Sequence, residues 1–146
     1  RIDIFIDKLV NKNIPIIGIC LGMQILGSWG HEEGKTKGLG LLKVSTKKIP
    51  LKNKKFKLPN IGWKNVKFVN KKKTCFEKFN NKKFYFVHSY AMQKIEKKFI
   101  LANTKYGGLN FISAFMKNKI IGFQFHPEKS GQTGLKLLQT TIKKII

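Results

Sequence analysis

The chain has 146 residues and a formal net charge of +23, because 30 Lys and Arg stand against only 7 Asp and Glu. Hydrophobic residues make up 42% of the sequence, which excludes a disordered or collagen-like chain and is enough for the core of one domain. No apolar run approaches the roughly 20 residues of a membrane-spanning helix, and two cysteines are too few for a disulfide framework, so we expect a cytoplasmic protein with no membrane partner.

The first part of the chain predicts a helix, a buried strand and a second helix. Apolar residues recur at helical spacing over residues 2–12, and Pro15 prevents this helix from continuing. Residues 14–19 are apolar without interruption, which is typical of a strand buried on both faces of a parallel sheet. Residues 21–29 are predicted to be a helix that begins directly after that strand, and the glycine-rich residues 31–40 a loop.

From residue 41 onwards the pattern favours strands. These are predicted at residues 41–49, 64–69, 83–90 and 99–104, with lysine-rich surface loops at 47–57 and 71–83. Residues 111–116 and 120–125 flank a short polar turn and predict a hairpin, and residues 131–146 predict a closing helix. We therefore expect an α/β fold over residues 1–146 as a single domain, with an open, mainly parallel sheet flanked by helices and extended by antiparallel additions.

One short motif has the form of a nucleophile elbow. In Gly18-Ile19-Cys20-Leu21-Gly22 a cysteine lies between small residues, at the junction of the predicted buried strand and the second helix. Such a turn lifts the Cys20 side chain clear of the sheet, and a helix N-terminus behind it favours the thiolate. The backbone N–H of Leu21 would then point to where an oxyanion forms. A small cysteine buried in the core is the alternative interpretation.

A thiolate nucleophile needs a base, and His126 is the best candidate among the three histidines. It lies at the end of a predicted strand that Pro127 terminates, and therefore on the rim of the sheet, where catalytic groups of open α/β folds gather. Glu128 could orient its imidazole, although a rim histidine beside a solvated carboxylate is the alternative. His31 and His88 are weaker candidates, and no cluster of His and Cys has the spacing of a metal site.

Three longer motifs together resemble those of the class I, triad-type glutamine amidotransferases. They are Gly18-Ile-Cys20-Leu-Gly22-Met-Gln24, Tyr85-Phe-Val-His88-Ser89-Tyr90 and Gly122-Phe-Gln-Phe-His126-Pro-Glu128-Lys129-Ser130. Within that family the resemblance is closest to the glutaminase subunits of imidazole glycerol phosphate synthases. Shorter matches at residues 32–34, 38–41, 59–63 and 106–107 follow in the family's order and extend the likeness over almost the whole chain.

The resemblance implies a role for each matched residue. Cys20 would attack the side-chain amide of glutamine and form a γ-glutamyl thioester, while His126 transfers protons and Glu128 orients it. The glutamine would be held by residues around the nucleophile, with the Leu21 N–H as one oxyanion donor. These binding residues are Leu21, Gly22, Gln24, Ser89 and Tyr90. No cofactor and no metal is implied.

The resemblance also implies a partner. Ammonia released from glutamine would pass to a (βα)₈-barrel cyclase subunit in a heterodimer, and Trp63 would pack against that subunit. The cyclase would make imidazole glycerol phosphate and aminoimidazole carboxamide ribotide for histidine biosynthesis. The alternative is a paralogous glutaminase that feeds a sugar amidotransferase in surface-polysaccharide synthesis. A third hypothesis is a stand-alone cysteine hydrolase.

The positive charge invites a nucleic-acid hypothesis, which the composition weakens. Arg1 is the only arginine, so the excess consists of lysines, which lack the bidentate fork that reads phosphates and bases. We interpret the lysines as a solvated surface and expect no nucleic-acid partner. A functional nucleic-acid face, and a patch that attracts an anionic substrate or an acidic partner, stay open as alternatives.

The chain departs from the family at its start. The family begins with a strand, a helix and a glycine-rich loop that precede the helix expected here at residues 2–12. We therefore expect this domain to lack its N-terminal segment, and the 146-residue chain to be poorly soluble or inactive. Residues 28–31, and Lys64 after Trp63, also differ from the family's usual pattern, which puts details of the partner interface in doubt.

Overall fold

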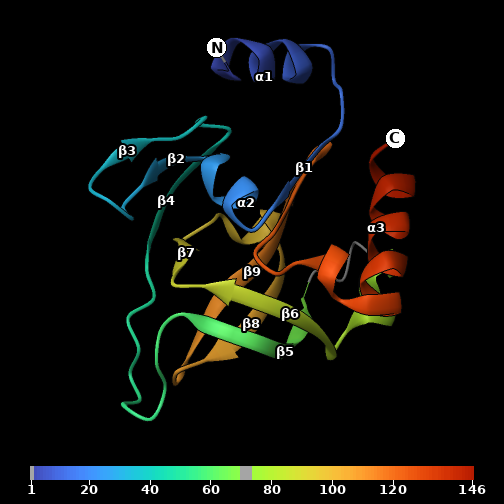
Figure 1. Ribbon diagram of the computed structural model, residues 1–146. Coiled ribbons are helices and arrows are strands. Elements are labelled where there is room, and N and C mark those ends of the chain that lie inside the picture. The colour runs from blue at the N-terminus through green and yellow to red at the C-terminus, as the bar shows by residue number, and fades with distance from the viewer. Residues whose placement is uncertain (1, 70–73) are drawn as a thin grey trace.

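The computed structural model describes residues 2–69 and 74–146, which form two β-sheets with helices around them (Figure 1). The strand order is β1-β10-β9-β8-β5-β6 in the larger sheet and β3-β2-β4-β7 in the smaller one. The larger sheet contains β1 (Ile16–Ile19), β5 (Asn60–Phe68), β6 (Lys82–His88), β8 (Ile100–Tyr106), β9 (Leu109–Lys117) and β10 (Ile120–Phe123). The smaller sheet contains β2 (Gly27–Gly30), β3 (Thr36–Lys37), β4 (Leu42–Lys48) and β7 (Tyr90–Gln93).

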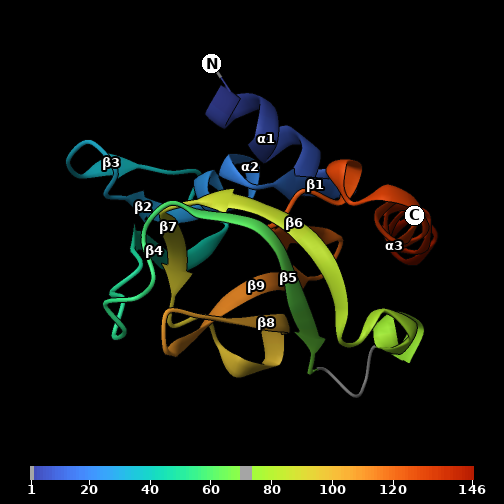
Figure 2. The same ribbon diagram turned by 60° about the horizontal axis from the view of Figure 1, so that its bottom comes forward.

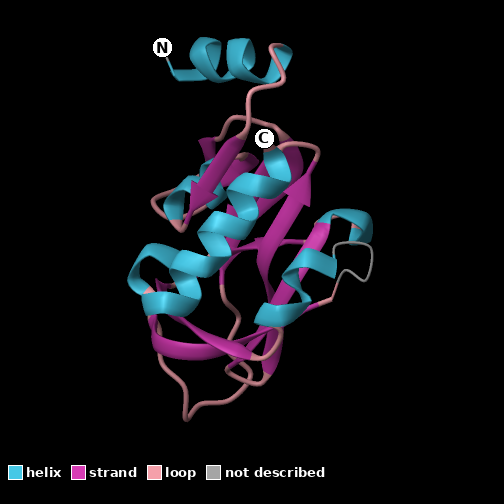
Figure 3. Ribbon diagram, turned by 90° about the vertical axis from the view of Figure 1, so that its right-hand side faces the viewer, coloured by secondary structure: helices cyan, strands magenta, loops and turns pink. Residues whose placement is uncertain are grey.

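The helices differ in how they contact these sheets. Helix α1 (Ile2–Asn11) contributes no buried residue and lies apart from both sheets, whereas α2 (Leu21–Ile25) follows β1 directly (Figures 1 and 3). Helix α3 (Gly131–Ile145) packs on the larger sheet and adds Leu137 and Ile145 to its core. Short 3₁₀ helices occupy Thr74–Phe79, Lys97–Phe99 and Pro127–Lys129. Within the described residues no helix is long and apolar enough to cross a membrane.

The larger sheet curls so that its two ends approach each other. Strands β1 and β10 pair in parallel, with Ile19 opposite Phe123. Strand β6 stands at the other end of the strand order, yet Tyr85 in β6 forms a bridge with His126, whose N–H donates to the Tyr85 carbonyl at 2.8 Å. Figure 2 shows β5 and β6 arching over the rest of the sheet. The end of β10 and the residues after it are therefore held by β1 on one side and by β6 on the other.

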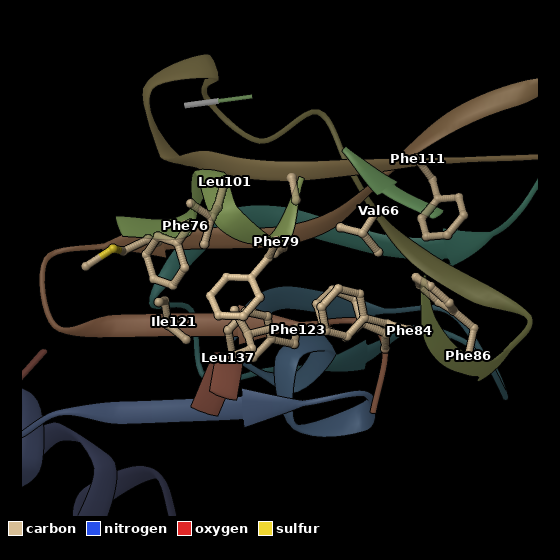
Figure 4. Close-up of a cluster of buried hydrophobic side chains, with 14 of the residues drawn as sticks. Val66, Phe76, Phe79, Phe84, Phe86, Leu101, Phe111, Ile121, Phe123 and Leu137 are labelled. Carbon is tan, nitrogen blue, oxygen red and sulfur yellow. The ribbon is translucent and has the colours of Figure 1, made fainter. Parts of the chain in front are cut away.

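Phenylalanine rings fill the space enclosed by this curved sheet. The Phe84 and Phe125 ring centroids are 4.5 Å apart, and those of Phe123 and Phe125 are 5.2 Å apart. Leu137 of α3 and Phe79 of the first 3₁₀ helix close the cluster (Figure 4). Because these rings are fully or almost fully buried and closely packed, the end of β10 has a rigid foundation.

The α/β class is confirmed, with helices flanking a mixed sheet, but parallel pairs do not predominate. Among the described strands only β1–β10 and β2–β4 are parallel, and the other pairs are antiparallel. The physical reason is the length of the connections. A parallel pair requires a crossover of a dozen or more residues, whereas β8, β9 and β10 are joined by turns of two residues.

Local predictions were confirmed for the first helix, the first strand, the closing hairpin, the last helix and the strands at 41–49, 64–69 and 99–104, and others were wrong in part. The predicted helix at 21–29 ends at Ile25, because residues 27–30 pair with β4 and β3. The predicted strand 83–90 is confirmed over residues 83–88, which lie in β6, but Tyr90 already belongs to β7 of the smaller sheet. Of the predicted loop 71–83, residues 71–73 lie outside the described residues, and Thr74–Phe79 is a 3₁₀ helix that carries two core phenylalanines.

Candidate active site

The parallel pair of β1 and β10 brings the predicted nucleophile and the predicted base to one edge of the sheet. Cys20 follows β1, and its backbone N–H donates to the Phe123 carbonyl at 2.7 Å. His126 follows β10 by three residues. Parallel strands present their carboxyl ends at the same edge, which is where α/β folds form their binding sites. Cys20 and His126 are 106 positions apart along the chain, and the pairing of β1 with β10 brings both to this edge.

Cys20 has the backbone geometry of a nucleophile elbow. Its φ is 51° and its ψ is −108°, a conformation in which an L-residue is strained. A Cβ added at Gly18 would lie 2.7 Å from the Gly22 carbonyl oxygen, so the expectation of a small residue there is confirmed. At Gly22 an added Cβ would meet no atom of the described residues within 4 Å, so the turn itself does not require glycine at that position.

The His126 ring is paired on one side and unpaired on the other. Its Nδ1 lies 2.6 Å from Glu128 Oε1, whereas its Nε2 is buried and has no hydrogen-bond partner among the described residues. Ser130 fixes the surrounding backbone, because its hydroxyl donates to the His126 carbonyl at 2.6 Å and accepts from the Tyr85 N–H at 3.0 Å. The carboxylate holds the proton on Nδ1 and leaves Nε2 able to accept one.

The surroundings of Cys20 raise the pKa of its thiol above the ordinary value. Burial is the largest cause, and the negative charge of Glu128 adds to it. The Leu21 backbone N–H, the Gln124 amide and the charge of Lys129 act in the opposite direction. Because burial prevails, the resting group is a thiol whose proton has to be removed by a base before the sulfur can attack.

His88 is excluded as that base by its environment. The side chain is buried between two partners, with Nδ1 2.8 Å from the Tyr90 carbonyl oxygen and Nε2 3.0 Å from Asn60 Nδ2. Burial, together with the charge of His126, lowers the pKa of His88 to about 4, although the bond to Tyr90 acts against this. The ring is therefore neutral at physiological pH and serves as a structural link.

A cavity opens beside the nucleophile. It has a volume of about 190 Å³ and extends from Cys20 to the segment between β6 and β7. Its lining is Cys20, Leu21, Gln24, Glu32, Val87, His88, Ser89 and Tyr90. A second cavity, of about 310 Å³, shares Leu21, Gln24 and Glu32 with the first and also contacts His31 and Glu33.

Four of the five predicted binding residues line these cavities. Leu21, Gln24, Ser89 and Tyr90 contact the cavity beside Cys20, whereas Gly22 is not among the residues that line it. Ser89 stands at the break where the chain passes from β6 in one sheet to β7 in the other. The sequence pattern did not predict this break.

Trp63 lies away from these cavities, on the outside of β5. It is 50% exposed, and its ring packs edge-to-face against Tyr85 at 6.1 Å between centroids. Ile61, two positions earlier on the same strand, is 53% exposed. Side chains two apart on a strand share a face, so Ile61 and Trp63 form an exposed apolar surface over β5.

The sequence patterns did not predict two polar residues of the site. Gln124 is fully buried and its Nε2 donates to Cys20 Sγ at 3.8 Å, and Asn60 is fully buried against His88. A polar residue within an apolar strand, as in Phe123-Gln124-Phe125, was the available signal for Gln124. Across residues 2–69 and 74–146 no group of three His, Cys, Asp or Glu side chains could hold a metal ion.

A protein-family model described as "Glutamine amidotransferase class-I" matches residues 4–145. The chain belongs to the class-I glutamine amidotransferase family. Relatives of this amidotransferase include "Imidazole glycerol phosphate synthase subunit HisH 2" of Methanococcus maripaludis, which is 47% identical over 143 residues. "Imidazole glycerol phosphate synthase subunit HisH" of Pelagibacter ubique is 44% identical over 131 residues. The match takes in 98% and 89% of this chain, and 69% and 62% of the two relatives.

Solved structures agree with the amidotransferase fold. A structure described as PurLQS from Thermotoga maritima superposes with a TM-score of 0.72 at 22% identity, covering 99% of this chain and 68% of the other. At that identity the likeness concerns the fold alone, and it supports the mixed sheet with flanking helices described above.

Proposed function

We propose that this chain is the glutaminase part of an imidazole glycerol phosphate synthase, which acts in histidine biosynthesis. It hydrolyses glutamine to glutamate and ammonia, and the ammonia passes to a cyclase partner. The observation that carries the proposal is the strained Cys20 at the same sheet edge as the His126–Glu128 pair. The relatives that are 47% and 44% identical support the choice of synthase.

The reaction begins with transfer of the Cys20 proton to His126 Nε2, the ring atom that has no hydrogen-bond partner in the described part of the chain. The sulfur attacks the side-chain amide carbon of glutamine, and negative charge develops on the amide oxygen, to which the Leu21 N–H donates. His126 returns the proton to the departing nitrogen, so ammonia leaves and a γ-glutamyl thioester remains. Water, deprotonated by His126, then attacks the thioester, and glutamate and the Cys20 thiol are released.

The substrate-binding residues belong to the proposal as well. Gln24, Ser89 and Tyr90 hold the glutamine in the cavity beside Cys20, and Gly22, in the first turn of α2, belongs to the same binding site. Glu128 keeps the His126 ring oriented throughout. Residues 1–146 belong to one amidotransferase domain, which acts in the cytoplasm, where cysteines stay reduced.

The partner that we propose is a (βα)₈-barrel cyclase, bound as a heterodimer over the Ile61–Trp63 surface. Within a closed complex ammonia stays unprotonated and therefore nucleophilic. The cyclase uses it to split a phosphoribosyl-formimino intermediate into imidazole glycerol phosphate and aminoimidazole carboxamide ribotide. The exposed aromatic on β5 supports this docking surface, because aromatic side chains carry much of the binding energy at interfaces.

Glutamate release from glutamine tests the proposal. The protein that carries these 146 residues is assayed alone, then with a barrel-type cyclase and its nucleotide ligand. We expect low turnover alone and strong stimulation in the complex. Cys20→Ala should abolish glutamine use and spare synthesis from added ammonium, because the cyclase site is untouched. Turnover that ignores this cyclase would instead favour a sugar-pathway glutaminase or a stand-alone hydrolase.

A further inference from the structure

A continuous series of hydrogen bonds leads from β5 to the nucleophile. It runs from Asn60 through His88 to the Tyr90 carbonyl, and from there through Gln24 and Gln124 to Cys20. Its members come from several separate segments of the chain. Apart from Cys20, Gln24 and Tyr90, which are half-buried, its side chains are buried.

The Tyr90 carbonyl fixes the direction of every bond in the series. A carbonyl oxygen only accepts, so both groups that contact it must be donors. These are Gln24 Nε2 at 3.0 Å and His88 Nδ1 at 2.8 Å. The amide orientation of Gln24 and the tautomer of His88 are thereby determined without reference to any other group.

From Gln24 the direction propagates to the sulfur. The second hydrogen of Gln24 Nε2 points to Gln124 Oε1 at 3.1 Å, so the oxygen of the Gln124 amide must face Gln24. Its nitrogen then faces Cys20, with Nε2 3.8 Å from Sγ. An amide N–H in this position stabilises a thiolate more than a thiol.

A second contact of the sulfur, with the Val87 carbonyl, has the opposite preference. The Cys20 thiol donates to the Val87 carbonyl at 3.7 Å, an oxygen that would repel a thiolate. Sγ therefore lies between an acceptor that favours the protonated form and a donor that favours the ionised form. Gln124 is the donor of these two groups. Its side chain is fully buried, so the core holds it in place whether or not glutamine is bound.

We propose that Gln124 is a further residue of the catalytic machinery, whose amide N–H orients the Cys20 sulfur and stabilises its thiolate. Gln24, held by the Tyr90 carbonyl, is a positioning residue that fixes which end of the Gln124 amide faces the sulfur. The inference rests on the proposed function, in which Cys20 is the nucleophile. Its first test requires no glutamine.

The test measures the pKa of Cys20 from the pH dependence of its alkylation by iodoacetamide. All variants carry Cys75→Ser, so that Cys20 is the one cysteine of the chain. Gln124→Met keeps the length of the side chain and removes the donor. We expect it to raise the alkylation midpoint and to slow alkylation at pH 7 about tenfold. Gln124→Glu should raise the midpoint further, because a carboxylate beside the sulfur also repels the thiolate.

Gln93→Met is the matched control. Gln93 is a half-buried glutamine of β7 whose Nε2 donates to the Ala91 carbonyl at 3.3 Å, and it lines a cavity that does not include Cys20. Its alkylation midpoint should equal that of the parent. A folded Gln124→Met variant with the parent's midpoint would overturn the proposal.

A second variant decides the matter if Gln124→Met does not fold, because Gln124 lies in the core. Gln24→Met removes the donor to Gln124 Oε1 at a half-buried position. It should raise the midpoint enough to lower the fraction of thiolate at pH 7 about threefold. An unchanged midpoint would contradict the proposal. The midpoint is used because reagent access changes the rate and not the pKa. A parent chain that alkylates normally and hydrolyses no glutamine, even with its cyclase, would refute the proposed function alone.

Discussion

At the scale of single residues, the three histidines of the chain have three different environments. His126 pairs with a carboxylate, and its buried Nε2 has no hydrogen-bond partner within residues 2–69 and 74–146. His88 is enclosed and neutral, and His31 lines the second cavity. The sequence predicted Cys20 and His126 because each stands in a motif whose local geometry is characteristic. It did not predict Gln124 or Asn60, because the role of a buried amide depends on which groups the fold brings to it.

His126→Asn should lower glutamine turnover in the complex by about 10²–10⁴-fold. Asparagine cannot accept and return the Cys20 proton, and burial keeps the thiol protonated without a base. Steady-state glutamate release measures the effect. The control is Cys75→Ser, which changes the other cysteine and should leave turnover within a few-fold of the parent. Near-normal turnover of His126→Asn would mean that another group is the base.

His88 makes the free energy of unfolding depend on pH. Its pKa is lowered from 6.5 to about 4 by burial, so the unfolded chain binds the proton more readily between these values. Stability from this residue is therefore present above pH 6.5 and is lost as the pH falls towards 4. At pH 5 the loss is about 2 kcal/mol relative to pH 7. Urea unfolding of the parent and of His88→Gln checks this: the difference between pH 7 and pH 5 should shrink in the variant, and equal differences would contradict the assignment.

At the scale of elements, patterns within one segment were informative and pairings between segments were not. The apolar run at β1, the hairpin of β9 and β10, and the amphipathic α3 all have a period that identifies them locally. Residues 27–29 were predicted as helix because their strand identity comes from pairing with another segment, β4. For the same reason the division of residues 83–90 between two sheets could not be read from their own composition.

The elbow between β1 and α2 supplies a matched pair of glycine substitutions. Gly18→Ala puts a methyl group 2.7 Å from the Gly22 carbonyl oxygen and 2.8 Å from Leu26 Cδ1, which should cost about 1–3 kcal/mol. Gly22→Ala adds a methyl group in α2 that meets nothing within 4 Å in the part of the chain that the structure describes, so it should be neutral or stabilising by up to about 1 kcal/mol. Urea midpoints measure both. Equal effects at the two positions would show that the Gly18 contact does not constrain the turn.

At the scale of the whole molecule, the site lies where the two sheets and the core converge. Strand β1 carries Cys20, the core beneath β10 supports His126, and the passage from β6 to β7 supplies the wall of the cavity. The charge of +23 does not mark this place. A larger cavity, of about 660 Å³, lies between the first 3₁₀ helix and α3, and its lining includes Lys78, Lys82, Lys136, Lys143 and Lys144 but none of the site residues.

The exposed surface over β5 gives the last prediction, which concerns the molecule and its partner together. Trp63 is half exposed and contacts Tyr85 alone among the aromatic rings of the described residues, so truncating it should change the stability of the free chain little. In the complex the same ring would be covered, and a central aromatic at an interface is commonly worth 2 kcal/mol or more. Trp63→Ala should therefore weaken cyclase binding about thirtyfold and leave the low turnover of the free chain unchanged.

Trp29→Ala provides the comparison for that prediction. Trp29 is also partly exposed, at 37%, but it lies on β2 of the smaller sheet, with Lys35 Nζ 4.3 Å from its ring centroid. Because both variants remove one surface tryptophan, a general loss of stability would affect them alike. Titration of glutamate release with the cyclase separates the cases. Loss of stimulation for Trp63→Ala alone places the partner over β5, whereas loss for Trp29→Ala alone would place it over the smaller sheet and contradict the proposed interface.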